Sequence, residues 1–279
     1  MASLLLVTLD AQLSDAVDKI AQTSEQRFRS VASAASAREW LAMQHFDVVV
    51  VDSRSVEEND AVDLLLLGFK HNPVLVGAIL GPDTIVRYDF QVQLIGGHVF
   101  DGKDALDKLA HCLTTLPARF TLGQKSYYGI LVVEDLDAPR DIICAYVESL
   151  GYPTVRGVRT ADEALRLLEQ NPYEYFCVIT DLRMPQVDGI ELIRRIRNNA
   201  LLAPLPVIAL TSSPSAENLS GCLSAGATGF LAKPPKKAVL RRELEKAKRI
   251  LLTGQSPRLW KGDDARQLET LLRRHGLEF

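Results

Sequence analysis

The chain has 279 residues, of which 47% are hydrophobic and 24% are charged, a balance typical of globular proteins with a buried core. This length fits two α/β domains of about 120–130 residues each better than one. No apolar run reaches the roughly 18–20 residues that a membrane-spanning helix requires. The first ten residues are apolar without a preceding basic segment, which favours a buried strand over a secretory signal.

Charge and cysteine placement narrow the class of protein further. Residues 1–117 contain 9 Lys and Arg against 16 Asp and Glu, a net charge of −7, whereas residues 118–279 contain 23 against 19, a net charge of +4. This difference predicts two units with different surfaces. The four cysteines form no Cys-x-x-Cys pair, which predicts reduced core residues of a cytoplasmic protein and neither a zinc site nor a disulfide framework: Cys112, Cys144, Cys177 and Cys222.

Short runs rich in Leu, Val and Ile predict ten strands, five in each half of the chain. The expected strands of the first half are 3–8, 28–32, 47–51, 74–79 and 97–100. Those of the second half are 129–133, 153–157, 176–180, 206–210 and 228–232. Helical stretches separate the strands, so each half is expected to form a parallel sheet with crossover helices. Both halves follow the same pattern, with Asp52 and Asp181 at corresponding places.

Local signals mark several helix ends. Thr160-Ala-Asp-Glu163 predicts a capping box, and Ser36-Ala-Arg-Glu39 predicts the same device in the first half. Asp137 is expected to cap a helix, and Gly151 is expected to end it. Leu240, Leu244, Ala247 and Leu251 follow helical spacing, which is typical of a last helix packed on its own sheet.

These patterns divide the chain into four parts: a first domain at 1–117, a linker at 118–127, a second domain at 128–252 and a tail at 253–279. The segment around the linker lacks hydrophobic periodicity. The tail is expected to hold one short amphipathic helix near 263–274.

Carboxylate, hydroxyl and ammonium side chains lie at the ends of four strands of the second half. Glu134 and Asp135 come directly after the first strand, and Asp181 ends the third. Three carboxylates at one edge of a sheet repel each other unless a cation lies among them, and such oxygen ligands suit Mg²⁺. Thr211 and Lys233 follow the last two strands, where a hydroxyl and an ammonium would suit a phosphoryl group on one carboxylate.

This motif set, Glu-Asp, Asp-x-x-Met-Pro-x-x-Asp-Gly, Thr-Ser and Lys-Pro, resembles the receiver domain of two-component response regulators over residues 128–250. The resemblance implies two flavodoxin-like, doubly wound, five-stranded parallel-sheet domains in tandem. It also implies that Asp181 accepts a phosphoryl group from a histidine kinase or phosphotransfer protein. The residues implied to bind Mg²⁺ are Glu134, Asp135, Asp181 and the backbone carbonyl of Arg183.

The resemblance assigns three further roles. Thr211 and Lys233 would contact the phosphoryl oxygens, and Phe230 would be the switch aromatic that turns inward as Thr211 moves. The Lys233–Pro234 bond is expected to be cis by analogy. Asp188 and Gly189, by contrast, are interpreted as a turn and helix start rather than as ligands.

The first half lacks most of this chemistry. Aligning the two halves places Thr8 and Leu9 at the acid pair, Ala78 roughly at Thr211 and Asp101 at Lys233. Asp52 alone remains, so the first half resembles a degenerate receiver, more weakly than the second resembles an intact one. Asp10 could take one place of the acid pair, which leaves residual activity as an alternative.

Rival functions are less well supported. A haloacid-dehalogenase-type phosphatase needs a second acid two residues after the nucleophile, where this chain has Arg183, and no phosphate-binding glycine loop for a nucleotide is present. No enzymatic activity is expected beyond Mg²⁺-dependent self-phosphorylation from a phosphodonor and slow autodephosphorylation. A DNA-binding regulator remains the alternative, because residues 236–279 contain 12 Lys and Arg against 6 Asp and Glu.

The sequence thus predicts a response regulator of a phosphorelay that acts by protein contact, without a separate output domain. The expected partners are a histidine kinase or phosphotransfer protein and a downstream protein, with a homodimer as an open alternative. Nucleic-acid and membrane partners are not expected.

Overall fold

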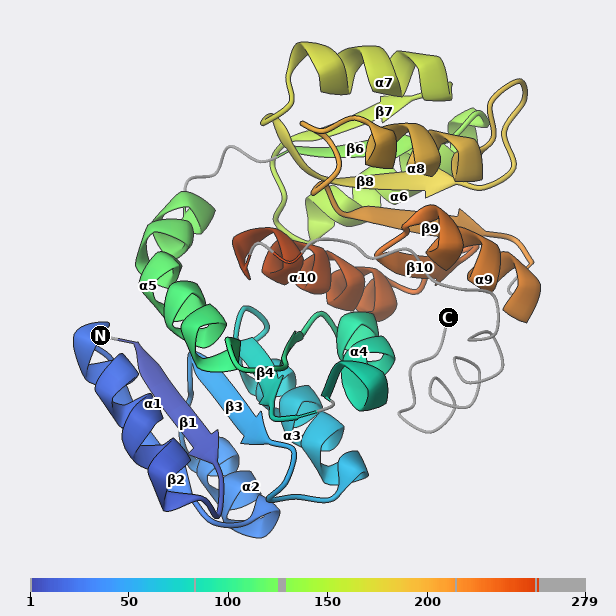
Figure 1. Ribbon diagram of the computed structural model, residues 1–279. Helices are drawn as coiled ribbons and strands as arrows, with labels where there is room; N and C mark the ends of the chain where they lie inside the picture. The colour runs from blue at the N-terminus through green and yellow to red at the C-terminus, as the bar shows by residue number, and fades with distance from the viewer. Residues whose placement is uncertain (1, 83, 125–128, 214, 254, 256–279) are drawn as a thin grey trace. The chain divides into compact units, whose positions relative to one another are not determined.

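The computed structural model describes residues 2–82, 84–124, 129–213, 215–253 and 255 (Figure 1). Internal contacts divide the chain into two compact units, Met1–Leu122 and Gly123–Phe279. Each unit contains one five-stranded parallel sheet flanked by helices. In the part of the chain that the structure describes, a helix long and apolar enough to cross a bilayer is not found.

The first unit alternates strands and helices along the chain. Its strands are β1 (Ser3–Val7), β2 (Arg27–Val31), β3 (Val48–Asp52), β4 (Val76–Leu80) and β5 (His98–Phe100). Its helices are α1 (Ala11–Thr23), α2 (Ala34–Met43), α3 (Glu58–His71), α4 (Thr84–Ile95) and α5 (Ala105–Gln124). The strand order across the sheet is β2-β1-β3-β4-β5. The order therefore reverses between β1 and β3, which is where open α/β sheets place their sites.

The second unit repeats this arrangement. Its strands are β6 (Gly129–Val133), β7 (Val155–Val158), β8 (Tyr175–Asp181), β9 (Val207–Thr211) and β10 (Gly229–Ala232). Its helices are α6 (Asp137–Ser149), α7 (Ala161–Gln170), α8 (Gly189–Asn198), α9 (Ala216–Ala225) and α10 (Lys237–Thr253). The strand order is β10-β9-β8-β6-β7, the same topology read from the opposite edge. Each unit is thus a doubly wound, flavodoxin-like domain, as the sequence predicts.

Burial explains why the central strands are nearly continuous apolar runs. All residues of β1, β3, β4, β6, β8 and β9 are buried, because helices cover both faces of each sheet. On one face of the first sheet, α1 and α5 supply Leu13, Val17, Leu109 and Leu113. On one face of the second, α6 and α10 supply Ile143, Val147, Leu240 and Leu244. The two cores fix the strand ends that carry the polar residues.

The ten strands expected from sequence are all present, with shifts of up to two residues at their ends. Thr160 caps α7, its hydroxyl accepting from the backbone N–H of Glu163 at 3.2 Å. Gly151 follows the end of α6 with φ of +92°, a left-handed conformation that favours glycine. The leucine stripe of α10 packs into the sheet core as expected, through Leu240, Leu244 and Ala247.

Two predicted helix caps are wrong. The cap of α2 is Ser33, whose hydroxyl accepts from the backbone N–H of Ser36, so the helix begins one turn before the expected capping box. Leu136 is the N-cap of α6 and makes no side-chain bond. Asp137 lies inside the first turn and pairs with arginine side chains instead. At α2, Ser33 and Ser36 could both serve as the cap, and at α6 the ion pairs of Asp137 with arginines hold its side chain away from a capping role.

The expected linker is partly helical. α5 continues to Gln124, and the contacts divide the chain between Leu122 and Gly123. Residues 118–124 therefore extend the last helix of the first unit rather than forming an irregular connection. The helix predicted near 263–274 lies outside the described residues.

Candidate functional site

Three carboxylates meet at the carboxyl ends of β6 and β8. Glu134 and Asp135 follow the last residue of β6, and Asp181 ends β8, the neighbouring strand. One oxygen from each of the three residues lies within 4.8 Å of the others. The parallel pairing of β6 and β8 brings these residues together, although 47 positions separate Glu134 from Asp181. The acid cluster predicted from sequence is therefore present.

The cluster lies largely out of water. Glu134 is fully buried, Asp181 is 6% exposed and Asp135 is partly exposed. Like charges held this closely in a poorly hydrated site repel one another and favour protonation or a bound cation. The ionised cluster therefore carries negative charge that the surrounding side chains neutralise only in part.

Lys233 provides that positive charge from the loop after β10. Its ammonium nitrogen lies 2.5 Å from Glu134 Oε2 and 2.8 Å from Asp181 Oδ2. The backbone N–H of Lys233 donates to Thr211 O at 2.8 Å, and the following Lys233–Pro234 bond is cis, as expected. One ammonium against three ionised carboxylates would still leave an excess of two negative charges.

Burial and pairing act in opposite directions on Glu134. Burial raises the pKa of this carboxyl above its usual value, and the hydrogen bond from Lys233 only partly offsets that rise. Glu134 Oε1 is buried and has no hydrogen-bond partner among the described residues. A buried oxygen without a donor is costly unless a ligand or water fills the place. One oxygen each from Glu134, Asp135 and Asp181 forms a ligand set that fits a hard divalent cation such as Mg²⁺.

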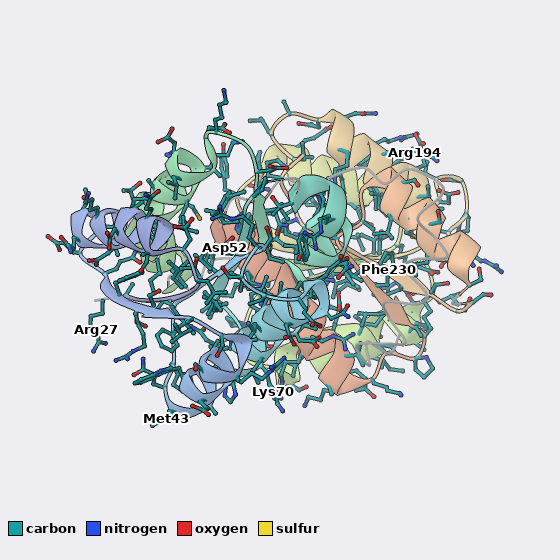
Figure 2. All side chains as sticks on the ribbon, turned by 60° about the horizontal axis from the view of Figure 1, so that its bottom comes forward. Arg27, Met43, Asp52, Lys70, Arg194 and Phe230 are labelled. Carbon is teal, nitrogen blue, oxygen red and sulfur yellow. The ribbon has the colours of Figure 1, made fainter. Side chains whose placement is uncertain are left out.

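Thr211 and Phe230 lie on the two strands beyond Asp181. Asp181 pairs with Leu210 across the sheet, so Thr211 lies one residue further along β9. The Thr211 hydroxyl donates to Ser213 O and accepts from Ser213 N, both at 3.1 Å, so its hydrogen bonds lie within its own loop. The Phe230 side chain is 8% exposed, and Figure 2 labels it on β10. Among the hydrogen bonds of the described residues, none joins Thr211 to the carboxylates.

The loop after Asp181 is held by a close backbone approach. A Cβ added at Gly189 would lie 2.1 Å from Asp181 O, so no larger residue fits there without movement. The Gly189 N–H donates to Leu182 O at 3.1 Å, and Asp188 caps α8 by accepting from Glu191 N at 2.8 Å. Asp188 is a capping residue, as the sequence predicts. The side chain of Arg183 is exposed.

Sequence reasoning missed an arginine behind the cluster. Arg140 donates to the backbone carbonyl of Glu134 at 3.1 Å and forms an ion pair with Asp137. Arg159 also pairs with Asp137, at 2.8 Å. An arginine one turn into the helix after an acid pair was the available signal, but its direction toward the backbone could not be read from spacing alone.

The same position in the first unit carries different residues. Strand pairing places Thr8 opposite the end of β3 where Glu134 stands in the second unit, in agreement with the sequence alignment. The residue corresponding to Thr211 is Gly81 and not Ala78, because Asp52 pairs with Leu80 as Asp181 pairs with Leu210. By the same register, Gly102 and not Asp101 corresponds to Lys233. Both corrections still leave the first unit without the hydroxyl and the ammonium.

Fold and site together define a receiver-type α/β domain with an acidic strand-end cluster. A family model of the response regulator receiver domain matches residues 130–245. Chemotaxis protein CheY-3 of Vibrio cholerae serotype O1 is 31% identical over 117 residues, 42% of this chain and 88% of that protein. Chemotaxis protein CheY of Pseudomonas aeruginosa is 30% identical over 117 residues, 42% of this chain and 93% of that protein. The chain belongs to the response regulator receiver family.

Solved structures show similar matches. The receiver domain of a sensor histidine kinase from Pseudomonas aeruginosa, described with magnesium coordinated in its active-site cleft, is 36% identical, with a TM-score of 0.40, and covers 43% of this chain and 97% of its own. A "probable two-component system response regulator/GGDEF domain protein" is 23% identical, with a TM-score of 0.42, and covers 90% of this chain and 99% of its own.

The close approach at Gly189 gives a stability prediction. Gly189→Ala should lower the free energy of unfolding of the second unit by about 3 kcal/mol or more, because the new methyl overlaps Asp181 O. Urea unfolding followed by circular dichroism measures this change. Gly221→Ala is the matched control, since the nearest atom to its Cβ is 3.6 Å away and alanine suits a helix interior. Equal unfolding midpoints for the two variants would contradict the close approach.

Proposed function

We propose that the second unit accepts a phosphoryl group on Asp181 from a histidine kinase or phosphotransfer protein and signals by protein contact. The observation that carries this proposal is the Lys233 ammonium 2.8 Å from the Asp181 carboxylate, in a cluster with two further acids. Such a cluster presents one nucleophilic oxygen beside groups suited to bind phosphoryl oxygens.

The chemistry is a transfer between two covalent carriers. An Asp181 carboxylate oxygen forms a bond to phosphorus as the bond between phosphorus and the donor imidazole nitrogen breaks, and the imidazole leaves. Attack by water later releases inorganic phosphate and restores the carboxylate. Both steps take place on Asp181 of the chain itself and convert no separate substrate. The chain is therefore proposed to be a phosphoprotein and not an enzyme in the usual sense.

Mg²⁺ is the proposed cofactor of this transfer. Glu134, Asp135, Asp181 and the backbone carbonyl of Arg183 would hold it, and the buried Glu134 oxygen without a partner supports that assignment. The cation would supply positive charge that brings phosphoryl oxygens next to carboxylates. Lys233 and Thr211 would then hold the remaining phosphoryl oxygens.

Phosphorylation would change the partners of Lys233. The ammonium now pairs with Glu134 and Asp181, and a phosphoryl group on Asp181 offers it stronger acceptors. Thr211 now bonds within its loop and would have to leave Ser213 to reach the phosphoryl group. Phe230 on the neighbouring strand is the proposed switch side chain. A ligand shifts an equilibrium only by contacts that differ between the two states, and these are such contacts.

An apolar surface beside the cluster suits the phosphodonor protein. Leu136 lies in the loop between β6 and α6 and is 59% exposed, and Ile142 and Tyr146 on α6 are 48% and 36% exposed. Ile142 and Tyr146 are four residues apart and share one face of the helix. A donor histidine must approach the carboxyl end of β8, so a protein that carries it would cover this surface. The proposed partner therefore presents a protein surface with an apolar centre.

The first unit is proposed to be a degenerate receiver that serves in docking or dimerisation. Its 1–117 segment has a complete fold with its own core, but its net charge of −7 differs in sign from that of the rest of the chain. Complementary charge gives specificity to protein contacts. The four cysteines are free, which fits the proposed cytoplasmic location. The DNA-binding alternative has less support, since the leucine stripe of α10 is core.

Phosphorylation should occur at Asp181 alone and should require Mg²⁺. Incubation with acetyl phosphate should label the wild type, whereas Asp181→Asn should remain blank because the amide lacks the nucleophilic oxygen charge. Intact-protein mass spectrometry with and without a chelator measures the label. Asp188→Asn is the matched control, because asparagine also caps helices well and should leave labelling unchanged. Label on Asp181→Asn that disappears only when Asp52 is also changed would reverse the assignment.

Thr211→Ala should weaken the response to phosphate while leaving much of the labelling. The hydroxyl is proposed to contact the phosphoryl group only in the active state. Its loss therefore reduces the shift toward the active state and not the phosphoryl transfer. Partner binding before and after phosphorylation measures the shift. Ser213→Ala, which keeps the backbone bonds to Thr211, should respond as the wild type does. An equal response from phosphorylated wild type and Thr211→Ala would contradict the switch role.

Separating the units tests the docking role. Because α5 runs to Gln124, the fragments should be 1–124 and 125–279. The second fragment should still accept phosphate but lose self-association or partner binding, measured by light scattering and by partner titration. A fragment that reproduces both the oligomeric state and the partner affinity of the whole chain would show that the first unit is only a spacer.

A further inference from the structure

The aspartate of the first unit is buried in a closed set of hydrogen bonds. Asp52 is fully buried at the end of β3, and Figure 2 labels it inside the first unit, whereas Arg27 and Met43 project outward. Asp52 Oδ2 accepts from the Thr8 hydroxyl at 2.8 Å and from the Ser55 hydroxyl at 2.9 Å. Two hydroxyls thus hold one oxygen of this carboxylate.

Arg54 provides the positive charge. Its Nε donates to Asp52 Oδ1 at 3.0 Å, and its Nη2 lies 3.3 Å from Asp52 Oδ2. The backbone N–H of Arg54 also donates to Oδ1, at 3.1 Å. The two side-chain contacts form the fork by which arginine binds a carboxylate with both nitrogens. The guanidinium therefore covers the carboxylate from the solvent side, where the Arg54 side chain is 49% exposed.

These contacts use the full accepting capacity of Asp52. A carboxylate offers about four lone-pair sites, and Asp52 receives two donors on one oxygen and three on the other. Burial alone would raise the pKa of Asp52, but hydrogen bonds from Arg54, Thr8 and Ser55 outweigh it and hold the pKa below its usual value. The carboxylate is ionised, and no oxygen is left open toward a phosphorus atom or a cation.

The same contacts join two loops. Arg54 Nη2 reaches Asp10 Oδ2 at 3.1 Å, and Asp10 also caps α1 by accepting from Gln12 N at 2.9 Å. The backbone N–H of Leu9 donates to Ser55 Oγ at 2.8 Å. The loop after β1 and the loop after β3 are therefore linked directly, at the place where acid residues and a cation would join them in the second unit.

A divalent cation does not fit this site. Thr8 and Leu9 stand where the second unit has Glu134 and Asp135, so the two outer carboxylates are missing. Leu9 is 69% exposed and offers no ligand atom on its side chain. The guanidinium already occupies the open side of Asp52.

We propose that Arg54 is a built-in replacement for the divalent cation, so that the first unit has a permanently filled site that needs neither metal nor phosphate. This inference concerns Asp52 and does not depend on phosphorylation of Asp181. It goes beyond the loss of outer acids, because the remaining aspartate is itself blocked. Asp10, the alternative second acid, is held by the same arginine.

Tryptophan fluorescence of the full chain tests this proposal. The chain has two tryptophans, Trp40 in the first unit and Trp260, so Trp260→Phe makes Trp40 a reporter of the first unit alone. In that background, Arg54→Ala should lower the thermal midpoint by about 10 °C, because a buried charge loses its partner. Arg38→Ala is the matched control: its ion pair with Asp60 is solvent-exposed, and its loss should change the midpoint by about 2 °C or less.

Cation dependence separates charge replacement from simple packing. Millimolar methylguanidinium should raise the midpoint of Arg54→Ala and leave the unvaried protein unchanged, whereas Mg²⁺, for which the outer carboxylates are missing, should change neither midpoint. Adding Asp52→Asn to Arg54→Ala should remove this response, since the uncompensated charge is gone. A midpoint of the unvaried first unit that rises with Mg²⁺, or an Arg54→Ala midpoint equal to that of Arg38→Ala, would overturn the proposal.

A second variant applies if Arg54→Ala does not accumulate as folded protein. Arg54→Lys keeps the charge but loses the fork, so its midpoint should lie below that of the unvaried protein and should not respond to methylguanidinium. An Arg54→Lys midpoint equal to that of the unvaried protein would contradict the role given to the fork. Acidification gives an independent reading. Because the pKa of Asp52 is lowered on folding, its contribution should be complete above about pH 4 and decline below it.

Discussion

An aspartate buried at the end of a central strand is the constraint on which both units depend. Each sheet ends its middle strand with such a residue, Asp52 in one and Asp181 in the other. A carboxylate in this position is stable only with nearby donors or cations, because removing it from water is costly. The residues that surround each aspartate supply the donors and the positive charge that this position requires.

The two units meet the requirement differently. In the first, Arg54 comes from the same loop as the aspartate and binds it with a fork, so the charge is balanced within three residues of chain. In the second, Lys233 comes from the loop after β10, a strand two places from β8 in the sheet, and is shared between Glu134 and Asp181. Balance by a local arginine is fixed. Balance by a distant, shared ammonium can change when the charge on Asp181 changes.

Sequence predicts what depends on local pattern or on shared topology. The ten strands follow from apolar runs, and the meeting of Glu134, Asp135 and Asp181 follows because parallel strands place their carboxyl ends on one edge. The cap at Ser33 and the helical course of residues 118–124 did not follow, since several polar residues compete for a cap and helix length depends on tertiary packing.

Errors of register had a similar cause. Ala78 and Asp101 were aligned by motif position, whereas the pairing of β4 and β5 places Gly81 and Gly102 there. The motif pattern does not single out Arg54, because the replacement for the lost acids is a base in the loop itself. A side chain that turns back onto its own strand end leaves no spacing pattern in the sequence.

The difference between the two aspartate sites indicates which unit can change its contacts on phosphorylation. A surface can respond to phosphate only if some contact exists in one state and not in the other. Thr211 bonds within its loop and Lys233 bonds to acids that phosphorylation would alter, so the second unit has contacts that can be exchanged. The hydrogen bonds of Asp52 are already filled, and the groups that donate them all belong to the first unit. A constant first unit beside a variable second one would let a partner bind one surface in every state and distinguish the states by the other.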